Sequence, residues 1–283
     1  MKKILTIALC LMLALSLAAC GGNTVTEDPT DASEATVAFD TVTDGVLTVA
    51  TSPDYAPYEF YAIDENGNAN LAGFDIELAK YIANELGLEI EFVPMDFDGV
   101  LMEVGLGTVD MGVAGLSPDP EREKTMDFSV TYYEGGQAFI TTKANADKFS
   151  DLASANQAGL QIGAQIGTIQ EDLAKQFSAD ADLVSLPKAT DIIAELIGGK
   201  LDGAYIEWDV AESYQKNYPE LVLVCEVPYE AEGNVIGVPK GNEELLAAIN
   251  AALTKCVEEG TFADFVAQAQ TLAEGEIVEG LLE

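Results

Sequence analysis

The segment from Gly115 to Arg122 contains a residue suited to binding an anion. Arg122 carries a planar guanidinium, which can hold a carboxylate through two parallel hydrogen bonds, a geometry that a lysine ammonium does not offer. Its neighbours Glu121 and Glu123 allow a second interpretation, a surface ion pair within the segment. The residue types therefore leave two roles open for Arg122: a ligand for a carboxylate, or a partner in a solvated ion pair.

A second set of polar groups could complete a site for a small molecule. Thr168 and Ile169 open an expected helix, and the free amides at a helix start bind anions, although a plain N-cap explains the same residues. Ser117 suits an N-cap or a ligand contact equally. Glu207 directly follows an expected strand, where its carboxylate either meets solvent or accepts from a cation, and Asp209 is a nearby competitor for that role.

The composition excludes several classes of function. Among the 283 residues, 49 acidic and 13 basic side chains give a formal net charge of −36. Such a surface repels phosphates, so a nucleic-acid partner is excluded. The absence of histidine from the sequence excludes a histidine-based metal site or catalytic triad, and no cofactor is expected. Cys225 and Cys256 are expected to be buried thiols rather than a disulfide.

The first twenty residues have the order of a bacterial lipoprotein leader. Lys2-Lys3 precede an apolar run from Ile4 to Leu17, which is too short to span a bilayer. Small residues then lead to Cys20 in a pattern that resembles the lipobox, which implies a signal peptide over 1–19 and lipidation of Cys20. Residues 20–40 have little apolar content and are expected to form a flexible tether.

From residue 46 onward, short apolar runs alternate with amphipathic runs, which is typical of an α/β fold. Two extended, glycine-containing segments, 132–141 and 229–238, bracket a second α/β set. If both cross between the sets, the second set is an inserted lobe that can close about a hinge; a single continuous sheet is the alternative. Helices are expected at 74–86, 97–106, 169–177, 190–197, 210–216, 243–258 and 262–269, with a short one starting at Ser117.

Five segments follow one another in the order of one known family: Ala50–Phe60, Leu71–Leu78, Met95–Val100, Gly115–Arg122 and Met126–Ser129. They resemble the polar amino acid-binding proteins of ABC importers, solute-binding family 3, over about residues 45–270. The resemblance implies an α/β, periplasmic-binding-protein-like fold with two lobes (a Venus flytrap), in which two parallel-rich sheets are joined by two hinge strands. The first lobe would comprise 41–136 and 232–283, and the second 137–231. The resemblance assigns ligand contacts to Ser52, Tyr55, Phe97, Gly115, Ser117, Arg122, Thr168, Ile169 and Glu207.

The resemblance also implies a role for each end of the ligand. A free amino acid carries a carboxylate and an ammonium, and burying either one unpaired costs several kcal/mol. Arg122 would bind the carboxylate, and Glu207, where the family usually has aspartate, would accept from the ammonium from the other lobe. Tyr55 and Phe97 match the aromatics that sandwich the ligand side chain. Ser52 stands where relatives that bind basic amino acids or glutamine often carry aspartate, which weakens the expectation of an arginine or lysine ligand.

The expected function is capture of a polar amino acid at the extracytoplasmic face of the cell membrane and its delivery to the permease subunits of an ABC importer. The lipid on Cys20 would anchor the protein, which is expected to be a monomer and not an enzyme. Two alternatives stay open. One is an enzyme on the same fold, similar to cyclohexadienyl or arogenate dehydratase, with Glu207 as an acid; the other is a ligand-binding sensor domain without a transporter.

Overall fold

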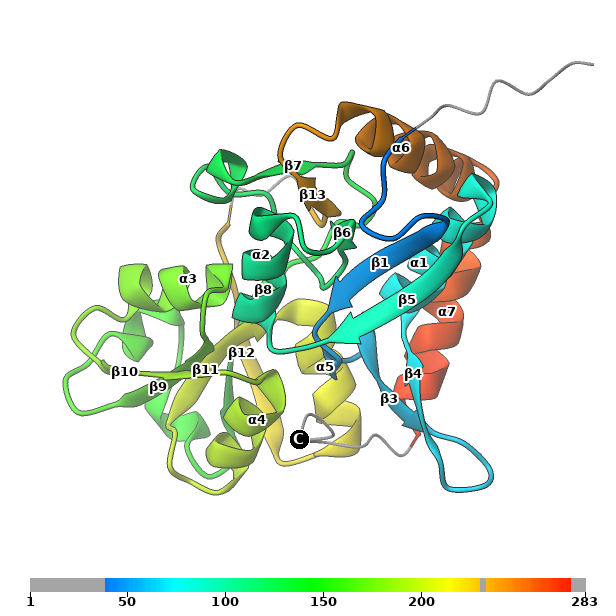
Figure 1. Cartoon of the computed structure of the whole chain (residues 1–283). Coiled ribbons are helices and arrows are strands. Elements are labelled where there is room, and N and C mark those ends of the chain that lie inside the picture. Colours follow the sequence, from blue (N-terminus) through cyan, green and yellow to red (C-terminus); the bar gives the residue numbers. More distant parts are fainter. Residues whose placement is uncertain (1–38, 230–232, 276–283) are drawn as a thin grey trace, which may run out of the picture. The chain divides into compact units, whose positions relative to one another are not determined.

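The computed structural model describes residues 39–229 and 233–275 (Figure 1). The expected signal peptide, Cys20 and all of the expected tether except residues 39 and 40 lie outside the described residues. Within the described ranges, no helix combines the length and the apolar character needed to cross a membrane. These ranges form an α/β fold with two five-stranded sheets and one small three-stranded sheet.

The first five-stranded sheet is mixed. Its strands lie in the order β5 (Glu89–Pro94), β1 (Val46–Thr51), β6 (Met111–Gly112), β13 (Gly237–Pro239) and β7 (Met126–Phe128). The first three are parallel, whereas β13 runs antiparallel to β6 and to β7. With the helices around it, this sheet forms the first lobe. Those helices are α1 (Phe74–Leu86), α2 (Phe97–Leu106), α6 (Glu243–Glu258) and α7 (Thr261–Ala273).

The second five-stranded sheet repeats this arrangement and forms the second lobe. Its strands lie in the order β10 (Asp182–Leu186), β9 (Gln161–Gln165), β11 (Gly203–Glu207), β8 (Gln137–Thr142) and β12 (Leu221–Val227). Again three neighbours are parallel, and the last two strands run antiparallel to their neighbours. Its helices are α3 (Ile169–Phe177), α4 (Ala189–Ile197) and α5 (Trp208–Asn217), with single 3₁₀ turns at Ala146–Lys148 and Leu152–Ala155.

Two segments carry the chain between the lobes. One runs from the end of β7 to the start of β8, and the other returns from β12 to β13. They lie side by side where Tyr133 and Asn234 form an isolated antiparallel bridge, with hydrogen bonds of 2.7 and 3.0 Å in the backbone around it. The two-lobed fold implied by the sequence is therefore present, with two connections close together, the arrangement that permits hinge motion.

The amphipathic periodicity of α1 shows why the predicted helices form where they do. Phe74, Leu78 and Ile82 recur at a spacing of four residues and are fully buried against the first sheet's core. The helix ends at Gly87, which adopts the left-handed conformation (φ 70°) and donates its amide back to the last turn. The other long helices also agree with the predicted ranges to within a few residues.

One predicted element differs from the structure. A helix was expected to start at Ser117, but only a single 3₁₀ turn forms, at Arg122–Lys124, and Ser117 does not cap it. Pro118 and Pro120 explain the difference, because each lacks an amide hydrogen and each restricts the residue before it to extended conformations. The chain therefore forms no helix at Ser117, and the turn that leads into Arg122 begins only at Pro120.

A three-stranded antiparallel sheet contains the second half of the segment Ala50–Phe60, one of the five segments that carry the family resemblance. It consists of β2 (Asp54–Tyr55), β3 (Glu59–Ile63) and β4 (Ala69–Ala72). Pairing of Asp54 with Phe60 and of Tyr55 with Glu59 holds the first two strands in register. This small sheet fixes three side chains that enter the pocket described below: Asp54, Tyr55 and Glu59.

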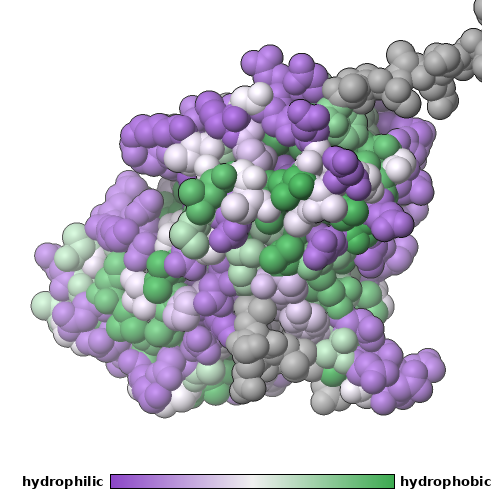
Figure 2. Space-filling view, in the orientation of Figure 1, coloured by the Kyte–Doolittle hydropathy of each residue, from purple (hydrophilic) through white to green (hydrophobic). Residues whose placement is uncertain are grey.

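The surface reflects the large number of charged residues in the composition. Figure 2 shows mostly hydrophilic residues over this face, with smaller hydrophobic areas between them. Both cysteines are free thiols: Cys256 is buried on α6 in the first lobe as expected, whereas Cys225 on β12 in the second lobe is only half-buried. No disulfide therefore joins these two cysteines across the lobes.

Candidate ligand-binding site

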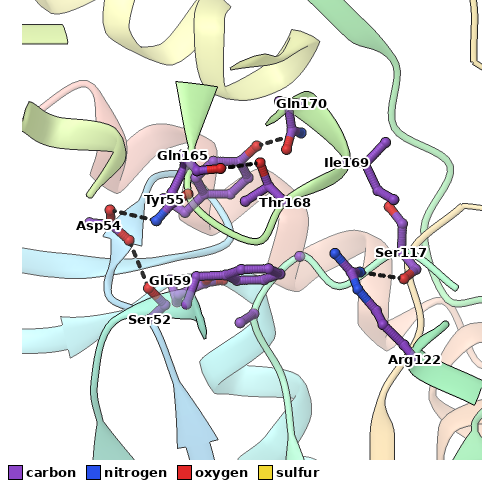
Figure 3. A pocket seen from close by; sticks show the side chains of 13 residues that line it. Ser52, Asp54, Tyr55, Glu59, Ser117, Arg122, Gln165, Thr168, Ile169 and Gln170 are labelled. Atoms are coloured by element: carbon purple, nitrogen blue, oxygen red, sulfur yellow. Dashed lines mark hydrogen bonds between the residues drawn. The ribbon is translucent and has the colours of Figure 1, made fainter. Parts of the chain in front are cut away.

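A cavity lies between the two lobes. Residues of the first lobe and of the second lobe both line it (Figure 3). The first lobe contributes Ser52, Asp54, Tyr55, Glu59, Phe97, Ala114, Gly115, Ser117 and Arg122. The second lobe contributes Gln165, Thr168, Ile169 and Gln170.

Arg122, the only arginine in the sequence, lies at one end of the cavity with Ser117 (Figure 3). Its Nη1 donates to the Ser117 carbonyl at 2.7 Å, and its Nη2 reaches across to the Gly167 carbonyl of the second lobe at 2.9 Å. The guanidinium carbon lies 5.5 Å from the centre of the Phe97 ring. Burial lowers the pKa of Arg122, but the group remains a cation at neutral pH.

The structure distinguishes between the two roles that the sequence left open for Arg122. Among the described residues, Arg122 forms no salt bridge, and the ion pair of its neighbour Glu121 is with Lys124. The guanidinium instead lines the cavity and bonds only to backbone carbonyls there. A positive charge with uncharged partners is available to an anionic group in the cavity.

Two carboxyl groups of the first lobe line the same cavity. Asp54 is 8% exposed, and its Oδ1 accepts from the Ser52 hydroxyl at 3.0 Å. Glu59 is 1% exposed, and no donor from the described residues reaches either of its oxygens. The group within reach of Glu59 is another carboxyl, Asp75, and two carboxyls can bond to each other only while one keeps its proton. An acidic wall therefore faces the cavity that holds Arg122.

The pKa values of these acids are set by burial. Burial, followed by the nearby charge of Asp75, raises the pKa of Glu59 well above its usual range. Burial raises the pKa of Asp75 to about 6, although Asp75 accepts from the Gly115 amide and the Tyr132 hydroxyl, both at 2.8 Å. A cation beside Glu59 would act in the opposite sense and favour the ionised carboxylate.

Gly115 connects this acid pair to the cavity. Its φ of +54° is a conformation that other residues rarely adopt, and a Cβ there would lie 3.4 Å from the rings of Tyr55 and Tyr58. Its carbonyl accepts from the Asn234 side chain at 2.9 Å. One lone pair of the Gly115 carbonyl is thus already used within the protein.

The second lobe presents uncharged polar groups. Thr168 caps α3, with its hydroxyl accepting from the Glu171 amide at 3.3 Å and donating to the Gln165 carbonyl at 2.7 Å. The first turn of α3 therefore opens on the cavity with free amides, which carry partial positive charge. Gln170 donates to the Tyr55 hydroxyl at 3.2 Å, which ties this wall to the aromatic side of the first lobe.

Glu207 is the one sequence-predicted site residue that is not among the described residues lining the cavity. Its carboxyl is 2% exposed and turns toward the two connecting segments, where it accepts from the Tyr58 hydroxyl at 2.5 Å. A Cβ on Gly135 would lie 1.8 Å from its Oε1, so the group fills the space beside the first connection. Burial raises the pKa of Glu207 to about 8. The competing acid Asp209 bonds to Tyr133 at 2.8 Å and does not line the cavity either.

This placement changes the charge arrangement expected from the sequence. A guanidinium from one lobe and a carboxylate from the other were expected to face each other, but among the described residues every charged group that lines the cavity belongs to the first lobe. Asp54 and Glu59 were not predicted as site residues. Strand alternation does not mark Glu59, because Glu59 and its neighbour Phe60 in β3 are both buried.

Residues 47–269 match the family of bacterial extracellular solute-binding proteins, family 3. The chain belongs to this family. Like the family, it acts outside the cytoplasm, and its architecture agrees with solved structures of members. An amino acid ABC transporter substrate-binding protein from Streptococcus pneumoniae, solved with L-arginine, superposes with a TM-score of 0.78 at 34% identity, over 82% of this chain and 97% of that one.

Curated relatives of this family 3 protein are mostly solute-binding proteins. The arginine-binding extracellular protein ArtP of Bacillus subtilis is 32% identical over 219 residues, which is 76% of this chain and 82% of the relative. An enzyme also occurs among them: the cyclohexadienyl dehydratase of Pseudomonas aeruginosa is 28% identical over 180 residues, 64% of this chain and 66% of the enzyme. ArtP thus matches this chain at a higher identity and over a longer stretch than the dehydratase does.

Proposed function

We propose that this family 3 protein binds a cationic α-amino acid, arginine foremost, between its lobes and delivers it to the permease of an ABC importer. The observation that carries the proposal is Glu59, a buried carboxyl in the cavity that also holds Arg122, whose oxygens no donor from the described part of the chain reaches. Arginine has a carboxylate for one of these groups and a guanidinium for the other. The arginine-binding relatives support the same ligand class.

The two ends of the ligand have distinct partners in this proposal. Arg122 and the first amides of α3 bind the α-carboxylate, because a guanidinium and a helix N-terminus both favour an anion. Glu59 and Asp54 bind the cationic groups. Phe97 and Tyr55 contact the aliphatic stem between them. Glu207 shapes the hinge beside the site, and Ser52 acts through its hydrogen bond to Asp54.

The serine at position 52 was expected to argue against a basic ligand, but the carboxyls of Asp54 and Glu59 supply the acidic groups that such a ligand needs. The aspartate that some relatives have at that place is missing, but Asp54 stands two residues later and is hydrogen-bonded to Ser52. A buried carboxyl that meets a guanidinium replaces its desolvation penalty with charge-assisted hydrogen bonds. An uncharged ligand side chain, such as that of glutamine, cannot do this for Glu59.

Isothermal titration calorimetry against arginine, lysine, histidine, glutamine, glutamate and cystine tests the proposal. We expect arginine to bind most tightly, with a Kd in the micromolar range or below, which corresponds to a binding free energy of about −8 kcal/mol or more negative. Glutamine is the matched control, because it has the same α-groups and no side-chain charge. Tighter binding of glutamate or glutamine than of arginine would overturn the proposed ligand class, and silence across the panel would overturn amino acid binding.

The proposal includes the place and the organisation of the protein. Lobe boundaries at 41–136 with 232–283, and at 137–231, agree with the sheet to which each strand belongs. The lipid on Cys20 would hold the site at the outer face of the membrane, close to the permease, with residues 20–40 as the tether. Replacing Cys20 with alanine should release the protein into the soluble fraction, whereas unchanged membrane association would contradict the anchor.

A dehydratase on this fold is the alternative that the Pseudomonas relative raises. In the sequence-based hypothesis Glu207 supplies the acid, and burial does raise its pKa to about 8, so that it holds a proton at neutral pH. However, Glu207 faces Tyr58 rather than the cavity. We therefore expect no aromatic product when the protein is incubated with prephenate or arogenate.

A further inference from the structure

Asp54 makes contacts across the cavity that set it apart from the other acids of the first lobe. Its Oδ2 accepts from the backbone amide of Ala189, the first residue of α4 in the second lobe, and from Gln165 Nε2 at 3.3 Å. Its backbone carbonyl accepts from the Tyr214 hydroxyl at 3.1 Å. One residue of β2 thus bonds to three separate elements of the opposite lobe, and Figure 3 shows the bond to Gln165.

The end of α4 that meets Asp54 lacks a cap of its own. The residue at its N-cap position is Lys188, whose side chain makes no capping hydrogen bond and carries the wrong charge for a helix N-terminus. The first amides of a helix have no partner within the helix. The Asp54 carboxyl therefore occupies the place of an N-cap aspartate, but it comes from the other lobe.

Contacts within the first lobe hold the Asp54 carboxyl in position independently of lobe closure. The Ser52 hydroxyl donates to Asp54 Oδ1 at 3.0 Å, and the Asp54 amide donates to the Ser52 carbonyl at 2.8 Å. The pKa of Asp54 is raised to about 6, because the effect of burial outweighs the opposite effect of the hydrogen bond from Ala189. The donors that compensate for the burial of Asp54 therefore come in part from the second lobe, and they are lost when the lobes part.

We propose that Asp54 is a positioning residue that holds the second lobe closed over the ligand by capping α4 from the first lobe. The proposal rests on the proposed function, since closure matters here as the step that retains a ligand. Its effect falls on the rate at which the ligand leaves. Removing a helix N-cap has an effect equivalent to about a 3- to 30-fold change in an equilibrium, so we expect a rise of about tenfold in koff.

The test uses the backbone donor, because Asp54 itself lines the cavity and Ala189 does not. Ala189→Pro removes the amide hydrogen that Asp54 accepts. Proline is favoured at the first position of a helix, and Lys188 already has the extended conformation (φ −120°, ψ 142°) that a residue before proline requires. Ala189→Gly keeps the amide and is the control at the same position. Thermal unfolding of each variant shows that it is folded.

Stopped-flow release of arginine, followed through the single tryptophan Trp208, measures koff in full-length wild type, Ala189→Pro, Asp54→Ala and the double variant. We expect both single variants to raise koff, Ala189→Gly to change it little, and the double variant to exceed the larger single effect by less than twofold, as coupled residues do. An unchanged koff in Ala189→Pro, or multiplied effects in the double variant, would overturn the proposal.

Small-angle scattering separates this outcome from failure of the proposed function. If arginine does not bind, the ligand assignment fails, while the radius of gyration without ligand still reports closure. We expect Ala189→Pro and Asp54→Ala to have a larger radius of gyration than wild type and Ala189→Gly. Equal radii for all four proteins would also count against the role of Asp54.

Discussion

The two walls of the cavity differ in charge although they are built on sheets of the same strand pattern. The first lobe carries the guanidinium of Arg122 and the carboxyls of Asp54 and Glu59, whereas the second lobe presents Gln165, Thr168 and Gln170. In both lobes the lining residues follow the carboxyl ends of parallel strands, where α/β folds place ligands. The difference indicates a division of work: the first lobe recognises charge, and the second lobe excludes water.

A neutral closing wall has a physical advantage. In the proposal, the charges that bind the ligand belong to the first lobe, where the Ser117 carbonyl holds Arg122 and the small β2-β3-β4 sheet positions the acids. The second lobe then closes without bringing a further charge out of water, which would cost several kcal/mol unless it were paired. Closure lowers the local dielectric, and the charge pairs of the first lobe become stronger as a result.

The comparison predicts its largest effect at Arg122. Arg122→Ala leaves the ligand carboxylate without its cation in a desolvated site, and we expect a loss of about 3 kcal/mol or more, roughly 200-fold in Kd. Arg122→Lys should recover only part of this, because an ammonium cannot form the bidentate contact. Calorimetry with arginine measures both. A loss below tenfold for Arg122→Ala would place carboxylate recognition elsewhere.

Glu59 should change which ligand is preferred rather than abolish binding. In Glu59→Gln the shape of the wall is kept but its ability to become an anion is lost. We expect arginine to bind about 10- to 100-fold more weakly, the scale of one charge-assisted hydrogen bond, while glutamine binds as before or better. The ratio of the two Kd values, measured by calorimetry, is the readout. An unchanged ratio would remove Glu59 from ligand selection.

The second lobe should give the smallest effect on affinity. Thr168→Val introduces a side chain of similar volume that lacks the hydroxyl and its hydrogen bonds to Glu171 and Gln165. A neutral hydrogen bond contributes about 0.5–1.5 kcal/mol, so we expect less than tenfold in Kd, with the same order of preference among ligands. If Thr168→Val weakened binding as much as Arg122→Ala, the proposed division between the lobes would be wrong.

Glu207 provides a prediction for stability instead of binding. Its pKa is about 8 in the folded protein against 4.5 for an ordinary glutamate, so between these values the folded state holds a proton that the unfolded state releases. The stabilising contribution is complete below about pH 4.5 and declines as the pH rises toward 8. Urea midpoints at pH 5 and pH 8.5 should differ less in Glu207→Gln than in wild type. Equal differences would contradict a proton on Glu207.

Much of the fold was predictable from local pattern. Apolar residues at helical spacing, such as Phe74, Leu78 and Ile82, together with a left-handed glycine at the helix end, identify an element without knowledge of its neighbours. The helix expected at Ser117 failed because Pro118 and Pro120 interrupt the amide pattern, a local signal that favours extended chain over a cap.

The sequence by itself determined the element order and the α/β class, because these depend on short-range periodicity, and the resemblance of its motifs to family 3 supplied the two-lobed division and the segments around Arg122, Tyr55 and Phe97. Only the tertiary structure decided which acids face the cavity. Glu207 and Glu59 are both buried, in β11 and β3, and no local pattern tells which of them meets Tyr58 and which meets the ligand space. That choice depends on how two sheets, distant in sequence, pack around the connecting segments.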